Sequence, residues 1–312
     1  MELIRGLANL KPRHRGCAAS IGNYDGVHLG HQQVLRELVT QARRRGVPAA
    51  VVVFEPAPLE YLEPDKAPAR LMNLREKVQA LAACGVDRLL CLRFNAALAQ
   101  MVAAEFIERV LVRGLGVRHL VVGDDFRFGR DRGGDLATLQ AAGAERGFEV
   151  QSLPGLLRTG ARVSSTRIRA CLAAGNLQLA AELLGGPYSL SGRVMHGEKL
   201  GKALGFPTAN IALKRRVAPV NGIFVAAVRA LDGATRYGAA YVGKRPAAGG
   251  RETRLEVFIF DFKGELYGRH LRVELLHQLR DDAQFGSLEA LKAQMAQDVA
   301  AARAWLKQRA LV

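Results

Sequence analysis

The sequence predicts a parallel α/β domain over residues 1–184, followed by a small antiparallel β-barrel domain over residues 187–312 that ends in a helix. The length of 312 residues exceeds that of most single domains. In the first half, short apolar runs alternate with segments of helical period, which is typical of a parallel sheet covered by helices. In the second half, β-rich runs follow one another with turns between them, which favours an antiparallel barrel.

Four apolar runs mark strands of the first domain, and periodic segments between them mark helices that would each cover a sheet face. The predicted strands span residues 49–54, 88–94, 119–123 and 148–153, and the predicted helices are centred on residues 34–39, 78–82 and 106–111. Gly185, Gly186 and Pro187 cannot continue the helix that ends at Leu184. We therefore place the domain boundary at this break.

The second domain contains five β-rich runs and one long helix. The runs span residues 188–194, 223–229, 237–242, 255–260 and 271–276. Ser287 has the residue type of an N-cap, and Glu289 follows in the first turn of the helix. Apolar residues then recur on one helical stripe, so we expect the helix to pack on the barrel. The stripe consists of Leu288, Leu291, Met295, Val299, Ala302 and Leu306.

The net charge of +16, from 45 basic and 29 acidic residues, is compatible with either nucleic acid or phosphorylated small molecules as partners. Aromatic residues make up only 6% of the chain and do not interleave with the basic runs, which argues against a stacking platform for single strands. No apolar run approaches the ~20 residues that span a bilayer, and charges interrupt the first residues, where a secretory signal would be continuous. Cys17, Cys84, Cys91 and Cys171 lack the spacing of a metal site, so we expect reduced core cysteines and a cytosolic protein.

The first chemical motif is IGNYDGVHLGHQ at residues 21–32, which follows a predicted buried strand. Gly22 and Gly26 lie in its turn, and His28 and His31 stand three residues apart, so the first turn of a helix would present both imidazoles. The start of a helix offers unbonded N–H groups and positive potential to a polyphosphate. This arrangement suits nucleotidyl transfer.

A second candidate phosphate clamp is VSSTRIR at residues 163–169. Ser164, Ser165 and Thr166 supply hydroxyls at a predicted helix start, and Arg169 follows Thr166 by three positions on that helix. Taken alone the motif is weak, because serine and threonine are common N-caps and arginine is commonly solvated.

The third motif is the glycine-rich stretch at residues 192–210, which ends in GFPTAN. Its glycines permit a phosphate to approach the backbone, and its last residues add a hydroxyl and an amide suited to Mg²⁺ and nucleotide. The candidates are Gly192, Gly197, Lys199, Gly201 and Gly205 for phosphate, and Thr208 and Asn210 for the metal.

Together with GDDFRFG at residues 123–129, these motifs occur in an order that resembles the bifunctional riboflavin kinase and FAD synthetase family, over nearly the whole chain. The resemblance implies a Rossmann-like nucleotidylyltransferase domain of the HxGH superfamily before the barrel. It implies that ATP and Mg²⁺ are used to convert riboflavin to FMN, and that FMN is then adenylylated to FAD with release of pyrophosphate.

The resemblance also implies roles for particular residues. His28 and His31 would stabilise the α-phosphate transition state, with Asn23 and the glycines Gly22 and Gly26 lining the nucleotide site. Ser164, Ser165, Thr166 and Arg169 would bind the departing pyrophosphate. The residues implied to approach the flavin are Phe54, Gly123, Asp124, Asp125, Phe126 and Phe128.

The role of Glu256 has two possible interpretations. Strand alternation alone predicts a polar residue on the solvent face, whereas the resemblance places the catalytic carboxylate of the kinase here. A base is useful in that reaction because the nucleophile is an alcohol. The FMN phosphate, with a second pKa of ~6, is already ionised at neutral pH and needs none.

Some positions depart from the common forms of the family and bear on flavin affinity and loop closure. They are Ala57, the stretch GKRPAAG with Lys244 and Ala247, and Phe258. We expect His196 to be structural.

Two alternatives remain open from the sequence. The chain could be a nucleotidylyltransferase with a degenerate regulatory barrel, which riboflavin-dependent ADP formation would exclude. It could also be a non-catalytic nucleic-acid-binding protein, which a negative gel shift at moderate salt would exclude. Under the favoured interpretation we expect only small-molecule partners, no membrane and no nucleic acid, and a monomer or weak homo-oligomer.

Overall fold

A computed structural model describes residues 1–312 except 198–200, 202–203, 214, 216, 230–232 and 248–249. The chain forms two compact units. The first comprises Met1–Pro68 and Leu74–Ser164, and the second comprises Ala69–Asn73 and Ser165–Val312.

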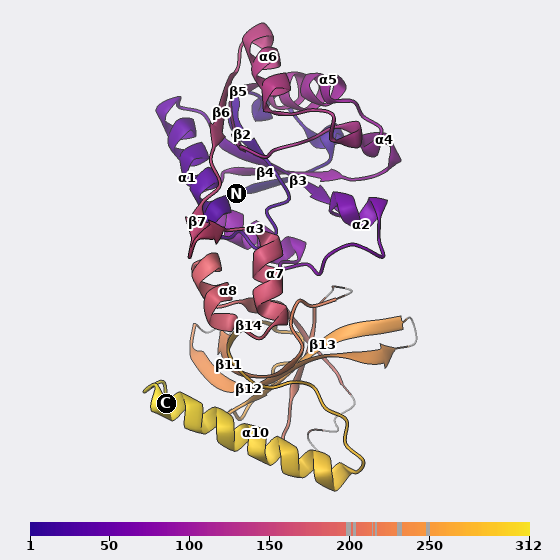
Figure 1. The fold of residues 1–312 in the computed structure, drawn as a ribbon, viewed down its shortest axis with the longest axis vertical. Helices are drawn as coiled ribbons and strands as arrows, with labels where there is room; N and C mark the ends of the chain where they lie inside the picture. The colour runs from indigo at the N-terminus through magenta and orange to yellow at the C-terminus, as the bar shows by residue number, and fades with distance from the viewer. Residues whose placement is uncertain (198–200, 202–203, 214, 216, 230–232, 248–249) are drawn as a thin grey trace. The chain divides into compact units, whose positions relative to one another are not determined.

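A six-stranded sheet with all strands parallel forms the centre of the first unit (Figure 1). Its strand order is β1-β4-β3-β2-β5-β6. The strands are β1 (Glu2–Arg5), β2 (Cys17–Ile21), β3 (Ala49–Glu55), β4 (Arg88–Arg93), β5 (Val117–Gly123) and β6 (Glu149–Leu153). A short hairpin of β7 (Leu157–Arg158) and β8 (Ala161–Arg162) follows.

Helices in the connections of the first unit bury the sheet. The helix α1 packs on β2, β3 and β5, and the π-helical segment η3 contributes Ile107, Val110 and Leu111 to the hydrophobic core. The helices are α1 (Leu29–Arg44), α2 (Pro58–Leu62), α3 (Leu74–Ala83), α4 (Ala96–Ala99), α5 (Ala103–Phe106), η3 (Ile107–Leu115) and α6 (Leu136–Arg146), with single turns η1 (Leu7–Asn9), η2 (Pro12–His14) and η4 (Arg130–Arg132).

The strand order reverses at β2. From this strand the chain proceeds outward through β3 and β4 on one side, and returns to add β5 and β6 on the other. In open α/β sheets, ligands bind beyond the carboxyl ends of the strands at such a reversal. The topology therefore directs attention to the ends of β2, β3 and β5.

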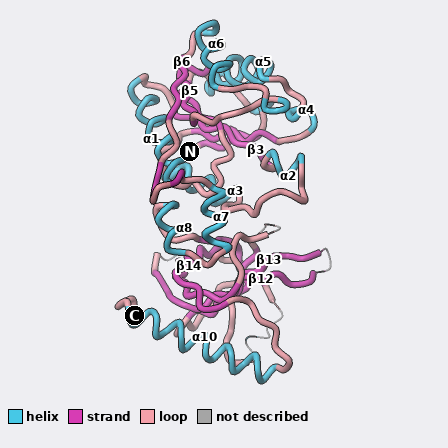
Figure 2. The backbone as a smooth tube through the Cα atoms, viewed as in Figure 1, coloured by secondary structure: helices cyan, strands magenta, loops and turns pink. Residues whose placement is uncertain are grey.

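The second unit is built on a closed antiparallel barrel with the strand order β10-β13-β12-β11-β14-β9, and two of its strands extend beyond the barrel as a hairpin (Figure 2). The strands are β9 (Ser189–Met195), β10 (Ala209–Ala212), β11 (Gly222–Arg229), β12 (Thr235–Ala247), β13 (Gly250–Ile259) and β14 (His270–Arg280). The helices α7 (Ser165–Ala173) and α8 (Leu177–Leu184) pack on each other, and α8 contacts β14.

The long helix α10 (Leu288–Gln308) packs on the outside of the barrel, against β11, β12 and β14. The Ser287 side chain caps it by accepting a hydrogen bond from the Ala290 N–H at 3.1 Å. Ala302 and Leu306 are fully buried against Val225 of the barrel. The predicted cap and packing of this helix are confirmed.

The second unit also incorporates the short segment Ala69–Asn73, which we call the strap. Leu71 of the strap is fully buried, and its carbonyl accepts a hydrogen bond from the Tyr188 hydroxyl at 3.1 Å. The Arg215 guanidinium donates to the carbonyls of Arg70 and Leu71 at 3.2 and 3.3 Å. These contacts fix the strap to the barrel.

The predicted fold class, a parallel α/β domain followed by an antiparallel barrel with a C-terminal helix, is confirmed. The strands β1, β7, β8 and β10 were not predicted. The helices α7 and α8, which the sequence assigned to the first domain, lie in the second compact unit. All four cysteines are free thiols, as expected, and three are buried, whereas Cys84 is only partly buried. Within the described residues, no helix is both long and apolar enough to cross a membrane.

Candidate active sites

Three predicted motifs of the first unit lie at the carboxyl ends of adjacent strands. The segment 22–28 follows β2, the segment 124–128 follows β5, whose last residue is Gly123, and Phe54 lies near the end of β3. β2 pairs with both β3 and β5 in parallel register. Motifs about a hundred residues apart in sequence are therefore brought to one edge of the sheet, at the reversal of strand order.

The two histidines stack at the start of α1. Their ring centroids are 3.7 Å apart and their planes differ by 13°. His28 is the N-cap, and its Nδ1 accepts the His31 backbone N–H at 3.3 Å. Because Nδ1 holds a lone pair in this bond, neutral His28 carries its proton on Nε2, which remains a donor.

His31 is held neutral by its surroundings. Burial, followed by the proximity of His28 and Lys77, lowers the pKa of His31 well below 6.5. No described atom bonds to its buried Nδ1. The pair thus offers N–H donors at the N-terminus of a helix, where an oxyanion is favoured.

The loop before the histidines is fixed in a strained conformation. Tyr24 and Val27 have φ values of 47° and 39°, which are unusual for residues with a Cβ and most of all for β-branched valine. The Ser20 hydroxyl donates to the Val121 carbonyl at 2.6 Å and accepts from the buried Tyr24 hydroxyl at 2.6 Å. Tyr24 also packs against His31, with ring centroids 5.0 Å apart. This anchoring leaves Asn23 exposed.

The start of the VSSTRIR motif lies beside the histidine pair. A Cβ placed on Gly30 would lie 3.3 Å from the His28 ring and 3.5 Å from the Val163 carbonyl oxygen, so glycine permits this close approach. Ser164 follows Val163 in the first unit. Ser165, Thr166 and Arg169 lie in or on α7 of the second unit, where the Arg169 Nε donates to the Ala69 carbonyl at 2.6 Å. Their role with pyrophosphate stays a prediction.

The acidic pair after β5 is held by one arginine. The Arg162 guanidinium lies 2.8 Å from Asp124 Oδ1 and 2.9 Å from Asp125 Oδ1. Burial opposes ionisation of Asp124, but the Gly155 N–H and Arg162 outweigh it and lower the pKa of this carboxyl. Arg162, which the sequence analysis did not identify, therefore orders the loop that begins at Gly123.

The aromatic residues after this pair form a layer. Phe126 and Phe128 stack with centroids 5.6 Å apart, and Phe128 packs on Phe106 in the core. Phe128 is only 7% exposed, so it supports Phe126 from behind and leaves the half-buried Phe126 as the accessible ring. Phe54 is edge-on to Phe94 at 6.0 Å.

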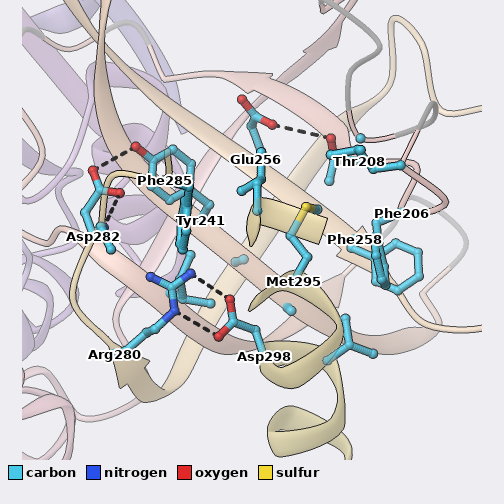
Figure 3. Close-up of a pocket in the computed structure, with 18 of the residues that line it drawn as sticks. Phe206, Thr208, Tyr241, Glu256, Phe258, Arg280, Asp282, Phe285, Met295 and Asp298 are labelled. Carbon is cyan, nitrogen blue, oxygen red and sulfur yellow. Dashed lines mark hydrogen bonds and ion pairs between the residues drawn. The ribbon is translucent and has the colours of Figure 1, made fainter. Parts of the chain in front are cut away.

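The second unit contains a cavity of about 650 Å³ between the outer face of the barrel and α10. Figure 3 shows Glu256 and Thr208 at one side of it, the pair of Arg280 and Asp298 at another, and apolar side chains of the barrel, the loop and α10 between and around them. The apolar lining includes Phe206, Ile223, Phe258, Phe285, Leu291, Met295 and Val299, and the polar lining includes Thr208, Asn210, Tyr241, Glu256, Arg280, Asp282 and Asp298.

Four cavity residues form one row across four strands. Strand register places Ile223 opposite Tyr241, Tyr241 opposite Glu256, and Glu256 opposite Asn210. Leu255 and Val257 on either side of Glu256 are fully buried, so Glu256 points outward as alternation predicts. The helix α10 and the loop before it cover this outer face of the barrel. The face therefore forms a wall of the cavity instead of contacting bulk solvent.

The polar end of the cavity has the donor set of a Mg²⁺ site. The Thr208 hydroxyl donates to Glu256 Oε2 at 3.4 Å, and Asn210 is the strand neighbour of Glu256. A Cβ on Gly197 would overlap the Asn210 amide, and one on Gly201 would lie 3.2 Å from Thr208 Oγ1. Hydroxyl, amide and carboxylate oxygens around a space kept open by glycines fit a hard cation.

The remaining candidates of the glycine-rich stretch have other structural environments. Gly192 is buried in β9, where a Cβ would overlap the Ala212 carbonyl oxygen of β10, so strand packing explains this glycine. Gly205 has a φ of 93° in the turn before Phe206. His196 stacks on Tyr267 with centroids 4.0 Å apart. Lys199 lies outside the described residues, and the side chains of Lys244 and Ala247 are likewise not described.

Sequence reasoning missed the polar wall at the far end of the cavity. Arg280 binds Asp298 through two hydrogen bonds, Nε to Oδ1 at 2.9 Å and Nη2 to Oδ2 at 2.8 Å. The hydrogen bond to Asp298 raises the pKa of Arg280. The Tyr241 hydroxyl donates to Asp282 Oδ2 at 3.0 Å (Figure 3). The one available signal was the R-D-D sequence after a predicted strand, which is too common to mark a site.

Comparison with known proteins matches both halves of the chain. The family model of FAD synthetase matches residues 10–167, and that of riboflavin kinase matches residues 184–306. Proteins named bifunctional riboflavin kinase/FMN adenylyltransferase are 52% identical in Pseudomonas fluorescens and 48% identical in Escherichia coli K12, each with 97% of both chains covered. A solved structure titled a macrolide-efflux protein from Streptococcus pneumoniae is 31% identical, with a TM-score of 0.79 over 96% of this chain and 97% of that one.

Proposed function

Because the chain belongs to the bifunctional riboflavin kinase/FMN adenylyltransferase family, we propose that residues 1–184 adenylylate FMN and residues 187–312 phosphorylate riboflavin. The chain carries out both reactions, from riboflavin to FMN with ATP and from FMN to FAD with release of pyrophosphate. The division is supported by the extents of the two family matches. It is further supported by the different chemical groups at the two sites.

In the kinase site we assign the general base to Glu256. The ribityl hydroxyl oxygen attacks the γ-phosphorus of ATP, its bond to phosphorus forms as the bond to the β,γ-bridging oxygen breaks, and its proton passes to the Glu256 carboxylate. Thr208 and Asn210 would hold Mg²⁺, which would neutralise charge on the phosphates. The single observation that supports this most strongly is that Glu256 lies in the cavity wall, 3.4 Å from the Thr208 hydroxyl.

The apolar part of the same cavity is suited to the flavin ring. Phe258 of the barrel, Phe285 of the loop before α10 and Met295 of α10 itself give the cavity an extended apolar wall. A ring system bound there would leave its ribityl chain free to run toward Glu256. Phe258, which departs from the common form of the family, thus lines the proposed flavin site, and its ring is compatible with flavin binding there.

In the adenylylation site, the already ionised FMN phosphate attacks the α-phosphorus of ATP without a general base. His28 and His31 stabilise the charge on the α-phosphate by donating hydrogen bonds, and Gly22, Asn23 and Gly26 line the nucleotide site. The acceptor role of His28 Nδ1, which places the proton of a neutral imidazole on Nε2, and the exposed Asn23 support these roles. Asp124, Asp125 and Phe126 would contact FMN from the neighbouring strand end.

Two variants test the division, each serving as the control for the other. Glu256→Gln keeps the shape of the side chain but not its basicity, so riboflavin phosphorylation should fall by roughly 10²–10⁴ while supplied FMN is still converted to FAD. His28→Ala should slow adenylylation by roughly 10² and let FMN accumulate from riboflavin. Chromatography of FMN and FAD over time, from either starting flavin, measures both. If each variant impaired both reactions equally, the assignment would be wrong.

The four free thiols are compatible with a reducing compartment, and on that ground we propose the cytosol. The expected monomer or weak homo-oligomer stays a prediction, which light scattering of the purified chain would test.

A further inference from the structure

The loop at residues 281–287 joins β14 to α10 and forms one wall of the kinase cavity, which it lines with residues 282–287. At its start, Arg280 Nη1 donates to the Asp281 carbonyl at 2.9 Å, and the guanidinium lies 5.6 Å from the centre of the Phe285 ring. Asp282 is exposed, but its carboxylate accepts the Tyr241 hydroxyl bond from the barrel at 3.0 Å. This bond ties the first part of the loop to β12.

The position of the Tyr241 hydroxyl is sterically defined. Gly243 lies two residues further along β12, on the same face of the strand, and a Cβ there would overlap Tyr241 Oη. Tyr241 also stands directly opposite Glu256 in the strand register. Its phenol ring therefore bridges the row that carries the proposed base and the loop that covers it.

We propose that Tyr241 is a positioning residue of the kinase site, which holds Asp282 and with it the 281–287 loop against the barrel, and so sets the affinity for riboflavin. The proposal rests on the assignment of this cavity to riboflavin. A hydrogen bond to a carboxylate is stronger than one between neutral groups. Without this hydrogen bond, the free loop would adopt more conformations. Riboflavin binding would then have to order the loop, and this loss of conformational entropy weakens the affinity for riboflavin. Glu256 is unchanged, so the chemical step is unchanged.

Tyr241→Phe in the full chain removes only the hydroxyl. The KM for riboflavin should rise about tenfold, which corresponds to about 1.4 kcal/mol, and kcat should stay within about twofold. Gly243→Ala, which displaces the hydroxyl but keeps the tyrosine, should give the same change. Tyr237→Phe is the matched control, because Tyr237 lies on the same strand among the residues under the C-terminal half of α10 and should leave both constants unchanged.

A double-mutant cycle separates this role from a general effect on stability. In an Asp282→Ala background, Tyr241→Phe should have no further effect on KM, because the bond is already lost. A full tenfold effect in that background, an unchanged KM in the single variant, or a fall in kcat at constant KM would each overturn the proposal. Adenylylation of supplied FMN should be normal in every variant. Failure of the unaltered chain to phosphorylate riboflavin would instead refute the assignment of the cavity.

Discussion

Replacement of Arg280 by methionine should strongly destabilise the second unit. Methionine retains much of the apolar stem but removes both hydrogen bonds to Asp298, at 2.9 and 2.8 Å. Asp298 is 7% exposed, and the remaining described bond to its carboxylate is from the Gln294 amide at 3.0 Å. The variant therefore leaves a buried carboxylate without its cation.

Removal of one partner from a buried ion pair costs about 3–5 kcal/mol, because the other charge stays buried. The Gln294 amide still serves Asp298, and the Arg280 side chain is 23% exposed, so water can replace part of the lost solvation. We therefore expect a loss near the lower limit, about 3 kcal/mol. A loss of this size is a large fraction of the stability of an ordinary domain.

Trp305 provides the assay, because it is the only tryptophan of the chain and lies on α10, stacked on His277. Its fluorescence during urea denaturation reports on the second unit, and the midpoint should move to lower urea in Arg280→Met. The double variant Arg280→Met/Asp298→Leu removes both charges and should recover most of the loss. If the single variant were as stable as the parent, or the double variant were less stable than the single, the reasoning would fail.

Three further predictions concern both sites. Gly197→Ala should crowd the Asn210 amide and raise the Mg²⁺ concentration needed for half-maximal riboflavin phosphorylation, with no change in adenylylation; equal Mg²⁺ dependence would contradict the metal role of Asn210. Arg162→Met should remove the positive charge that pairs with Asp124 and Asp125, so that the two carboxylates repel anionic FMN. The KM for FMN should rise roughly tenfold at low salt and less at high salt, because salt screens the repulsion; a salt-independent change would contradict this. Because the folded-state pKa of His31 lies well below 6.5, the unfolded chain protonates first, and stability should fall as pH drops below 6.5. Thermal unfolding at pH 7.5 and 5.5 should show a smaller fall in His31→Gln, and an equal fall in both proteins would count against this.

The sequence predicted the fold where strands are buried on both faces. The runs at residues 49–54, 88–94 and 119–123 are apolar because helices cover both sides of the parallel sheet, and each corresponds to an observed strand. The strand β10 was not predicted, because its four residues begin two positions after the GFPTAN proline and include polar Asn210. Short strands of mixed polarity give no periodic signal.

The candidate sites were predicted unevenly for a similar reason. Local motifs such as His28 to His31 determine their own geometry, since residues three apart meet on a helix. The Glu256 environment depends on α10, which covers the strand from more than thirty residues away in the chain. Alternation correctly predicted an outward side chain, but only tertiary packing turns that face into a cavity wall. The same holds for the Arg280 and Asp298 pair and for Tyr241 and Asp282.

The strap has a consequence for how this protein can be divided. The chain enters the second unit at residue 69, leaves it after residue 73 and re-enters at residue 165, so no single cut yields both units intact. A gene fragment beginning at Pro187 would encode Tyr188 and Arg215 without the carbonyls that they bind, and would leave the space of Leu71 empty. Gene fission between the two activities would thus require the kinase fragment to acquire a substitute for five residues encoded far upstream. A synthetic peptide of residues 69–73, added to such a fragment, is the natural complement to supply.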